Sequence, residues 1–195
     1  MRDARTRIGC LGLAANPPHI GHYEMAVVIA ESAYVDRVIF VPTFSPPWEK
    51  EDMVSWAHRL AMCRLLAREK FVVSTAEARL GGVSYTINTL RAFQKERPSR
   101  DFFWCVGSDV VKGKGYLRWH QWKMLSQNFS ILVVDRPGYA LDGEDLPDCF
   151  IRIRTEKIPD ISSTQIRHMV RDGKDIEPYV GKDIAEYIEK HRLYR

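Results

Sequence analysis

The chain has 195 residues, of which 45% are hydrophobic and 28% are charged. This balance is typical of a globular protein and excludes an intrinsically disordered chain, and the length suits one domain with its own core. The formal net charge of +4 comes from basic residues spread among 25 acidic ones, so nucleic-acid binding is not expected as the main role.

The four cysteines, Cys10, Cys63, Cys105 and Cys149, are far apart and predict neither a zinc site nor a redox pair. The N-terminus passes directly into a strand-like run without a secretory hydrophobic region, and no apolar stretch approaches the ~20 residues of a membrane span. We therefore expect a cytoplasmic protein with reduced cysteines and no membrane segment. The sequence leaves the oligomeric state open, a homo-oligomer included.

Short apolar runs alternate along the chain with longer helical patterns. Six runs are predicted as strands: Arg7–Leu13, Arg37–Pro42, Phe71–Thr75, Phe102–Val106, Ser130–Asp135 and Phe150–Arg154. Between them we predict helices at Ile20–Tyr34, Ser55–Glu69, Thr86–Arg97 and Gln121–Gln127. Repeated strand-then-helix order predicts an α/β fold, a Rossmann-like open parallel sheet with helices on both faces, over residues 1–155.

The last part of the chain, residues 156–195, has a helical pattern. Helices are predicted at Ser163–Arg171 and Gly181–His191, and no linker is long enough to separate them as a second domain. We expect one domain over residues 1–195, with these helices packed at one end of the sheet. Ligands of open parallel sheets bind beyond the carboxyl ends of the strands, near the topological switch point.

A phosphate site is predicted directly after the first strand. Residues 14–18 lead to His19, Gly21 and His22 at the opening turn of a helix. The N-terminus of a helix has free N–H groups and a partial positive charge, and the two imidazoles, three residues apart, lie on one helical face. Two alternatives stay open: the histidines could be metal ligands, although no nearby carboxylate or thiol completes a set, or they could be structural.

A second phosphate signal lies at Ile161–Arg167. Its hydroxyl residues follow a break at Pro159 and predict a helix N-terminus, with Ser162 as the capping residue. The hydroxyls could serve only as a cap. Arg167, however, lies about one turn into this helix, where it can project toward an anion held by the free N–H groups.

With both segments placed, the chain resembles the nucleotidyltransferase superfamily that carries H-x-G-H and I-S-S-T-x-x-R motifs. Within it, the chain is similar to the bacterial nicotinate-nucleotide adenylyltransferases over nearly its whole length. Further pieces occur in the order of that family, at 58–62, 77–79, 82–86, 89–90, 107–109, 119–122, 132–138 and 193–194.

The resemblance implies that the phosphate of nicotinate mononucleotide attacks the α-phosphorus of ATP. The products are nicotinate adenine dinucleotide and pyrophosphate, in a step of NAD biosynthesis. The attacking phosphate is already ionised and needs little help from a general base, so positioning and charge neutralisation are expected to carry the rate.

The resemblance also implies the acting residues. His19, His22 and Arg167 are the expected catalytic residues: the histidines contact the ATP phosphates, and Arg167, with the helix start at Ser163 and Thr164, holds the outgoing pyrophosphate. Magnesium is expected to be carried by ATP, without protein ligands of its own. The remaining residues expected to bind ATP are Gly12, Asn16, Lys50, Gly107 and Asp109.

The mononucleotide is expected near the middle of the chain. The family comparison points to backbone N–H groups of Tyr85 and Thr86 for its carboxylate, to the face of Trp119 for its ring, and to Arg136 as a further polar contact. Core packing is the alternative for Trp119, and more so for Trp122. Preference for the acid or the amide mononucleotide is left open.

The chain departs from the family pattern at two places. Gly12, Leu13, Ala14 and Ala15 stand where the family usually has two glycines, a small hydroxyl residue and a phenylalanine. Leu13 would obstruct a close approach of ligand or backbone unless its side chain points into the core. In residues 46–50 the usual Pro-Pro-His-Lys is altered, and Lys50 is expected to take the phosphate role of the usual lysine from one position later.

Two rival functions follow from these observations. Transferases that use phosphopantetheine, and cytidylyltransferases, share the two phosphate motifs. A nucleotide-binding regulator that has lost catalysis is the other rival, motivated by Leu13 and the altered loop. The retained His19, His22 and Arg167 argue against it.

Overall fold

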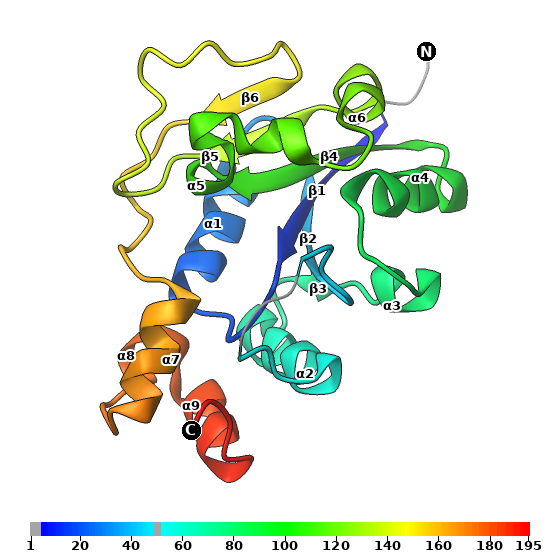
Figure 1. Ribbon diagram of the computed structural model, residues 1–195. Helices are drawn as coiled ribbons and strands as arrows, with labels where there is room; N and C mark the ends of the chain where they lie inside the picture. The colour runs from blue at the N-terminus through cyan, green and yellow to red at the C-terminus, as the bar shows by residue number, and fades with distance from the viewer. Residues whose placement is uncertain (1–4, 49–51) are drawn as a thin grey trace.

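A parallel six-stranded sheet forms the centre of the molecule (Figure 1). The computed structural model describes residues 5–48 and 52–195. The strand order is β3-β2-β1-β4-β5-β6, which is the order of doubly wound dinucleotide-binding folds. The strands are β1 Thr6–Leu13, β2 Arg37–Pro42, β3 Val72–Val73, β4 Arg100–Gly107, β5 Ile131–Val134 and β6 Phe150–Ile153.

Helices connect these strands and continue after the last one. Within the sheet region they are α1 Ile20–Glu31, α2 Trp56–Ala67, α3 Ala76–Leu80, α4 Thr86–Glu96, α5 Ser108–Val111, the 3-10 helix η1 Lys112–Arg118 and α6 Trp122–Asn128. The C-terminal segment contains α7 Ser163–Arg171, α8 Glu177–Val180 and α9 Lys182–Lys190.

Two hydrophobic clusters lie on the two faces of the sheet. Alternate residues of a strand point to opposite faces, and β1 follows this rule. Leu11 and Leu13 belong to the cluster shared with α1 and α2, whereas Ile8 and Cys10 belong to the cluster shared with α4 and α6. Helices therefore cover both faces, which explains why the central strands are apolar without alternation.

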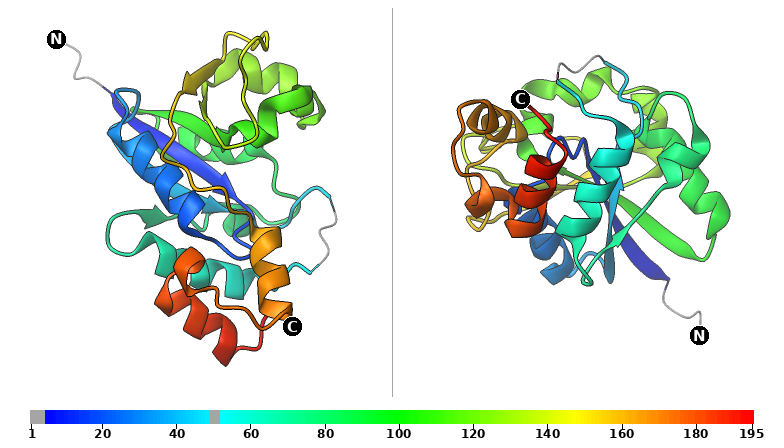
Figure 2. Two further views of the ribbon diagram at one scale, coloured as in Figure 1. Left: turned by 90° about the vertical axis from the view of Figure 1, so that its left-hand side faces the viewer. Right: turned by 90° about the horizontal axis from the view of Figure 1, so that it is seen from below.

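The C-terminal helices pack at the end of the sheet toward which β1 runs, beside α2 (Figures 1 and 2). Buried residues of α7 and α9, such as Ile166 and Ile184, join the same hydrophobic cluster as Leu11. The phenol of Tyr194 reaches back and donates a hydrogen bond of 3.0 Å to Oδ1 of Asn16. This segment therefore shares its core with the sheet.

The carboxyl ends of β1 and β4 are neighbours in the sheet, and their connections leave in opposite directions. The chain from β1 goes to α1 and β2, whereas the chain from β4 goes to α5 and β5. Such a switch point leaves a crevice beyond the strand ends. The segment Asn16–His22 and the segment Gly107–Asp109 both lie there.

The structure corrects several predicted boundaries. The strand predicted at Phe71–Thr75 is reduced to Val72–Val73, because at the edge of the sheet it pairs with β2 alone. The helix predicted to reach Tyr34 ends at Glu31, where the hydroxyl of Ser32 bonds to the carbonyl of Ile29 at 2.6 Å. The short helices α3, α5, η1 and α8 were not predicted. Among the described residues, no helix has the length and apolar character needed to cross a membrane.

Candidate active site

The two histidines of the first loop form a reciprocal cap on α1. Nδ1 of His19 accepts a hydrogen bond of 3.1 Å from the backbone N–H of Gly21, and Nδ1 of His22 accepts one of 3.2 Å from the backbone N–H of His19. The ring centroids lie 3.8 Å apart. Because Nδ1 of each ring is an acceptor, each imidazole carries its proton at Nε2. Two imidazole N–H groups thus lie at the start of a helix.

His19 is buried, with 2% of its surface exposed. Burial lowers the pKa of His19 well below its usual value, and the nearby His22 and Arg136 lower it further. His19 is therefore a neutral hydrogen-bond donor. Gly21 leaves the space for its ring, because a side chain at Gly21 would press against the imidazole.

This lowered pKa predicts a loss of stability in acid. The unfolded chain binds a proton at His19 below pH ~6.5, whereas the folded protein resists protonation, so the free energy of unfolding falls as the pH drops below ~6.5. Replacing His19 by Asn keeps an N-cap acceptor and removes this titration. Urea unfolding between pH 5 and 8, expressed relative to pH 8, should show a shallower acid decline in His19→Asn. The control variant His120→Asn, at an exposed site, should lose stability in acid as the wild type does. If His19→Asn lost stability to the same extent as this control, the prediction would be contradicted.

Asn16 organises the loop between β1 and α1. Its amide donates to the carbonyl of Asp52 at 3.1 Å, and its Oδ1 accepts from the N–H of Val54 at 3.2 Å as well as from Tyr194. Its carbonyl accepts from Arg167 at 3.0 Å. In the structure these hydrogen bonds hold the loop in place. A contact between the Asn16 side chain and ATP, as predicted, would require some of them to break.

The start of α7 lies against the same loop. Ser162 caps the helix as predicted, with Oγ accepting from the N–H of Gln165 at 3.2 Å. Oγ of Ser163 donates to the carbonyl of Pro17 at 2.8 Å, and Arg167 reaches Oγ1 of Thr164 at 3.3 Å. The buried Nε of Arg167 has no hydrogen-bond partner among the described residues. The two predicted phosphate segments are thus brought together.

The end of β4 contributes Gly107 and Asp109. The carboxylate of Asp109 pairs with Arg136 at 3.3 Å, and the Arg136 side chain is only 16% exposed. A side chain at Gly107 would require the side chains of Asp109 and Arg136 to shift, so these three residues are closely packed. Arg136, predicted to touch the mononucleotide, lies beside Asp109 and near His19, on the side of the phosphate loop.

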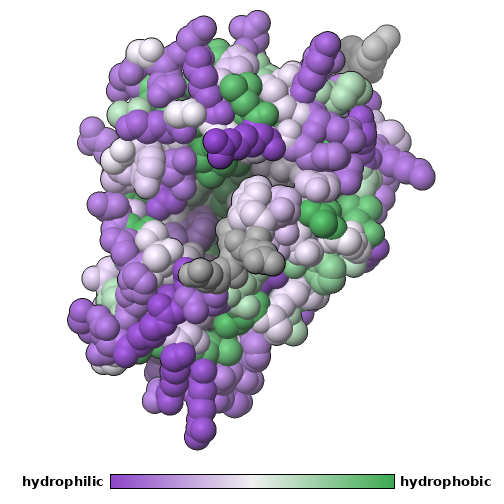
Figure 3. All heavy atoms as spheres, viewed as in Figure 1, coloured by the Kyte–Doolittle hydropathy of each residue, from purple (hydrophilic) through white to green (hydrophobic). Residues whose placement is uncertain are grey.

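A cavity of about 480 Å³ opens next to the phosphate loop. Tyr85, Thr86 and Trp119, all predicted to bind the mononucleotide, lie together on its wall. Figure 3 shows the face of the molecule that is hollowed near its centre, with hydrophobic residues inside the hollow. Trp122 instead stacks on Phe150, with ring centroids 5.5 Å apart, and serves as core packing.

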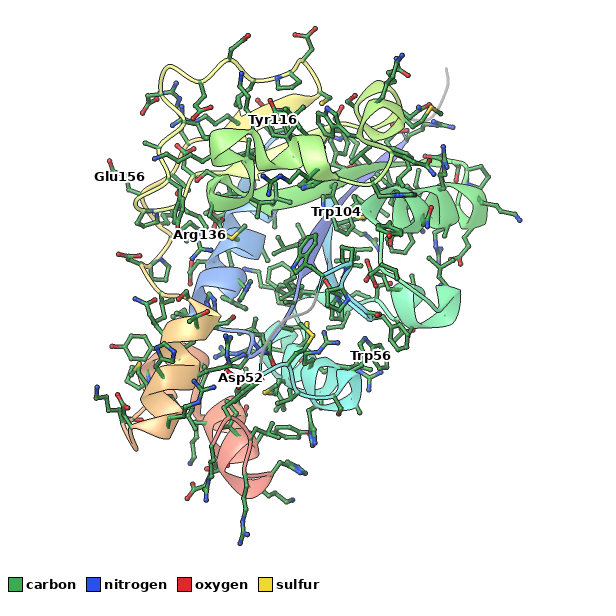
Figure 4. All side chains as sticks on the ribbon, viewed as in Figure 1. Asp52, Trp56, Trp104, Tyr116, Arg136 and Glu156 are labelled. Atoms are coloured by element: carbon green, nitrogen blue, oxygen red, sulfur yellow. The ribbon has the colours of Figure 1, made fainter. Side chains whose placement is uncertain are left out.

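The sequence analysis missed other residues on the cavity wall. Trp104 projects from β4 into the centre of the view in Figure 4, and its indole occupies the space that a side chain at Gly12 would need. Gly12, predicted to contact ATP, therefore lines the cavity and accommodates Trp104. Arg118 and His120 flank Trp119 in sequence and also line the cavity, and the ring of His120 stacks on Tyr85 with centroids 4.0 Å apart.

Leu13 does not block the site. Its side chain is 6% exposed and belongs to the hydrophobic cluster beneath α1 and α2, on the face of β1 opposite Trp104. The Leu13 side chain therefore packs in the core, although the residue also borders the cavity together with Gly12. Lys50, predicted to contact phosphate, lies outside the described residues.

A buried guanidinium supports the loops around the cavity. Arg59 on α2 is 2% exposed and donates to four backbone carbonyls: Val54, Ala14, Thr43 and Phe44. Burial lowers the pKa of Arg59, and nearby Glu77 counteracts this effect. Glu77 itself accepts from the N–H of Phe44 at 3.1 Å. The sequence contained an indication that Arg59 is buried, because residues 59, 62, 63 and 66 share one face of the helix.

Comparison with known proteins assigns the family. Residues 14–169 match the family described as Cytidylyltransferase-like. A probable nicotinate-nucleotide adenylyltransferase of Clavibacter michiganensis is 33% identical over 193 residues, covering 98% of this chain and 95% of the relative. One from Thermus thermophilus is 34% identical over 191 residues, covering 97% and 100%. The chain belongs to the nicotinate-nucleotide adenylyltransferase family.

The fold of this nicotinate-nucleotide adenylyltransferase family member also agrees with a solved structure. Plasmodium falciparum nicotinic acid mononucleotide adenylyltransferase, complexed with NaAD, superposes with a TM-score of 0.82 at 17% sequence identity and covers 97% of each chain. At that identity the likeness establishes the shared Rossmann-like α/β fold. The roles of individual residues rest on the geometry above.

Proposed function

We propose that this chain transfers the adenylyl group of ATP to nicotinate mononucleotide. An oxygen of the mononucleotide phosphate forms a bond to the α-phosphorus of ATP, and the bond between that phosphorus and the α,β-bridging oxygen breaks. Pyrophosphate leaves, and nicotinate adenine dinucleotide is formed. The observation that carries this proposal is the adjacency, at the end of β1, of an aromatic cavity and a loop that carries His19 and His22 and lies against Arg167.

The two subsites are continuous along the chain. Gly12, Leu13 and Ala14 line the cavity, and Asn16 begins the phosphate loop two residues later. A ring stacked on Trp119 would thus place its own phosphate toward His19 and His22. Adenosine would lie at Gly107 and Asp109, on the other side of the switch point, so the acceptor phosphate and the α-phosphate meet between them.

Negative charge in this reaction would be stabilised by imidazole N–H donors and guanidinium groups. His19 and His22 would donate to oxygens of the transferred phosphoryl group, while Arg167 and the first turn of α7 would hold the leaving pyrophosphate. Imidazole N–H and guanidinium groups favour phosphate oxygens over magnesium. We therefore propose that Mg²⁺ arrives coordinated by the triphosphate.

Pyrophosphate release tests the proposed function. ATP with Mg²⁺ is supplied together with nicotinate mononucleotide, nicotinamide mononucleotide, phosphopantetheine or no acceptor, and CTP replaces ATP in a parallel series. Rapid release with ATP and nicotinate mononucleotide is expected. Release only with phosphopantetheine, release only with CTP, or ATP binding without turnover would each overturn the proposal and favour one of its rivals.

Trp119 gives a more specific prediction. Stacking of a base on an aromatic side chain is worth about 1–3 kcal/mol, so Trp119→Ala should raise the KM for nicotinate mononucleotide by roughly 5- to 150-fold. The KM for ATP should change less than ~2-fold. Trp122→Phe, which alters the neighbouring core aromatic, is the control and should leave both constants near normal. If Trp119→Ala changed the KM for ATP as much as the KM for nicotinate mononucleotide, the Trp119 ring would not be a specific contact of the acceptor.

A further inference from the structure

We propose that Arg136 is a positioning residue that holds the adenosine side and the pyrophosphate side of the ATP site at a fixed spacing. The inference rests on the proposed function insofar as ATP is the ligand that spans both sides. The role is distinct from the mononucleotide contact expected from the sequence, because Arg136 lies with Asp109 and His19.

The first set of contacts anchors Arg136 to the end of β4. Its backbone N–H donates to Oγ of the buried Ser108 at 2.9 Å, and its Nη1 donates to Oδ2 of Asp109 at 3.3 Å. The aliphatic part of the side chain packs so closely on Gly107 that a Cβ there would require it to shift. The expected adenosine residues, Gly107 and Asp109, are therefore both in contact with Arg136.

The second contact reaches the C-terminal segment. Nη2 of Arg136 donates to the carbonyl of Ile161 at 2.9 Å. Ile161 is 5% exposed and directly precedes Ser162, the N-cap of α7. The helix α7 carries Arg167 and the hydroxyls of the expected pyrophosphate site. This one hydrogen bond therefore fixes the distance between the start of α7 and the end of β4.

The other hydrogen bonds from α7 go to a different loop. Ser163 and Arg167 bind the carbonyls of Pro17 and Asn16, which belong to the loop after β1. Among the hydrogen bonds of the described side chains, the bond from Arg136 is the one that joins the Gly107–Asp109 end to the segment before α7. A forked guanidinium, 16% exposed, suits this task because two of its nitrogens serve two elements at once.

The test compares ligands that fill one side or both. Dissociation constants for ATP, AMP and pyrophosphate, each with Mg²⁺ and without acceptor, are measured by calorimetry for the wild type, Arg136→Met and Arg136→Lys. The control is Arg152→Met, since Arg152 is also a guanidinium, 16% exposed, that bridges Asp135 and Asp142 without reaching α7. Folding of each variant is followed by circular dichroism, and Arg136→Lys serves if Arg136→Met does not fold.

In both Arg136 variants ATP binding should weaken at least ~10-fold, while AMP and pyrophosphate each weaken less than ~3-fold. Arg152→Met should leave all three constants within ~3-fold. A loss of ATP affinity that equals the loss of AMP affinity would confine Arg136 to Asp109 and overturn the inference. Wild-type affinity for ATP in Arg136→Lys would also overturn the inference, because a positive charge without the forked guanidinium would then be sufficient. A wild type that does not bind ATP would instead refute the proposed function.

Discussion

Substitution of His22 by alanine is expected to lower kcat at least ~100-fold in a protein that still folds, the scale of losing one donor to the transition-state charge. The proton of the His22 imidazole is at Nε2, because its Nδ1 accepts a hydrogen bond from the backbone N–H of His19. Its ring centroid is 3.8 Å from that of His19, so the two imidazoles lie together at the start of the helix. Single-turnover formation of nicotinate adenine dinucleotide gives the measurement.

A matched variant separates catalysis from capping. His22 occupies the N3 position of α1, where glutamine is a common partner in a capping box. His22→Gln should keep the cap and the stability of the helix but lose the imidazole, so its kcat should fall as far as that of His22→Ala. Near-normal turnover in the glutamine variant would show that the ring acts only as a cap and would remove it from the mechanism.

Replacement of Arg59 by methionine is expected to lower the free energy of unfolding by about 3–5 kcal/mol, the range for breaking a buried charged network. Four carbonyls at the ends of β1 and β2 and before α2 would lose their donor. Burial already raises the pKa of Glu77, and the loss of the nearby cation would leave that carboxyl less compensated. Urea unfolding at pH 7 measures the change.

Two further variants make the Arg59 result interpretable. Arg79→Met removes an exposed arginine that pairs with Glu96 at 3.0 Å, and a surface pair of this kind should cost less than ~1 kcal/mol. Arg59→Lys keeps the charge but offers one ammonium group to four acceptors, so an intermediate loss is expected. If Arg59→Met costs no more than Arg79→Met, the carbonyl network does not support the fold.

The architecture was readable because both faces of the sheet are covered. The central strands β1, β2 and β5 are apolar on both sides, so they stand out from the helices between them. The edge strand β3 was predicted too long, since Val72 is 65% exposed and the strand pairs with β2 over only two residues. The short helices α3 and α5 were missed because four or five residues contain too little periodicity.

Local features of the candidate site could be predicted where the residues involved are close together in the sequence. The histidine pair lies within a single helical turn, and Ser162 was identified as a cap from its local pattern. The position of Arg136 depends on contacts with Asp109 and Ile161, at sequence separations of 27 and 25 residues, and no local rule predicts them. Leu13 could be judged only once its face of β1 was known.

The hydrogen bond between Tyr194 and Asn16 joins residues 178 positions apart in the chain. Ribosomes add about 5–20 residues per second, so roughly 10 to 35 s separate the synthesis of these two partners. During that time the sheet can form, but Asn16 lacks one of its hydrogen-bond donors. Nascent chains halted before residue 194 should therefore contain a native-like sheet with an incompletely supported phosphate loop, and ATP binding should be among the last properties that the growing protein acquires.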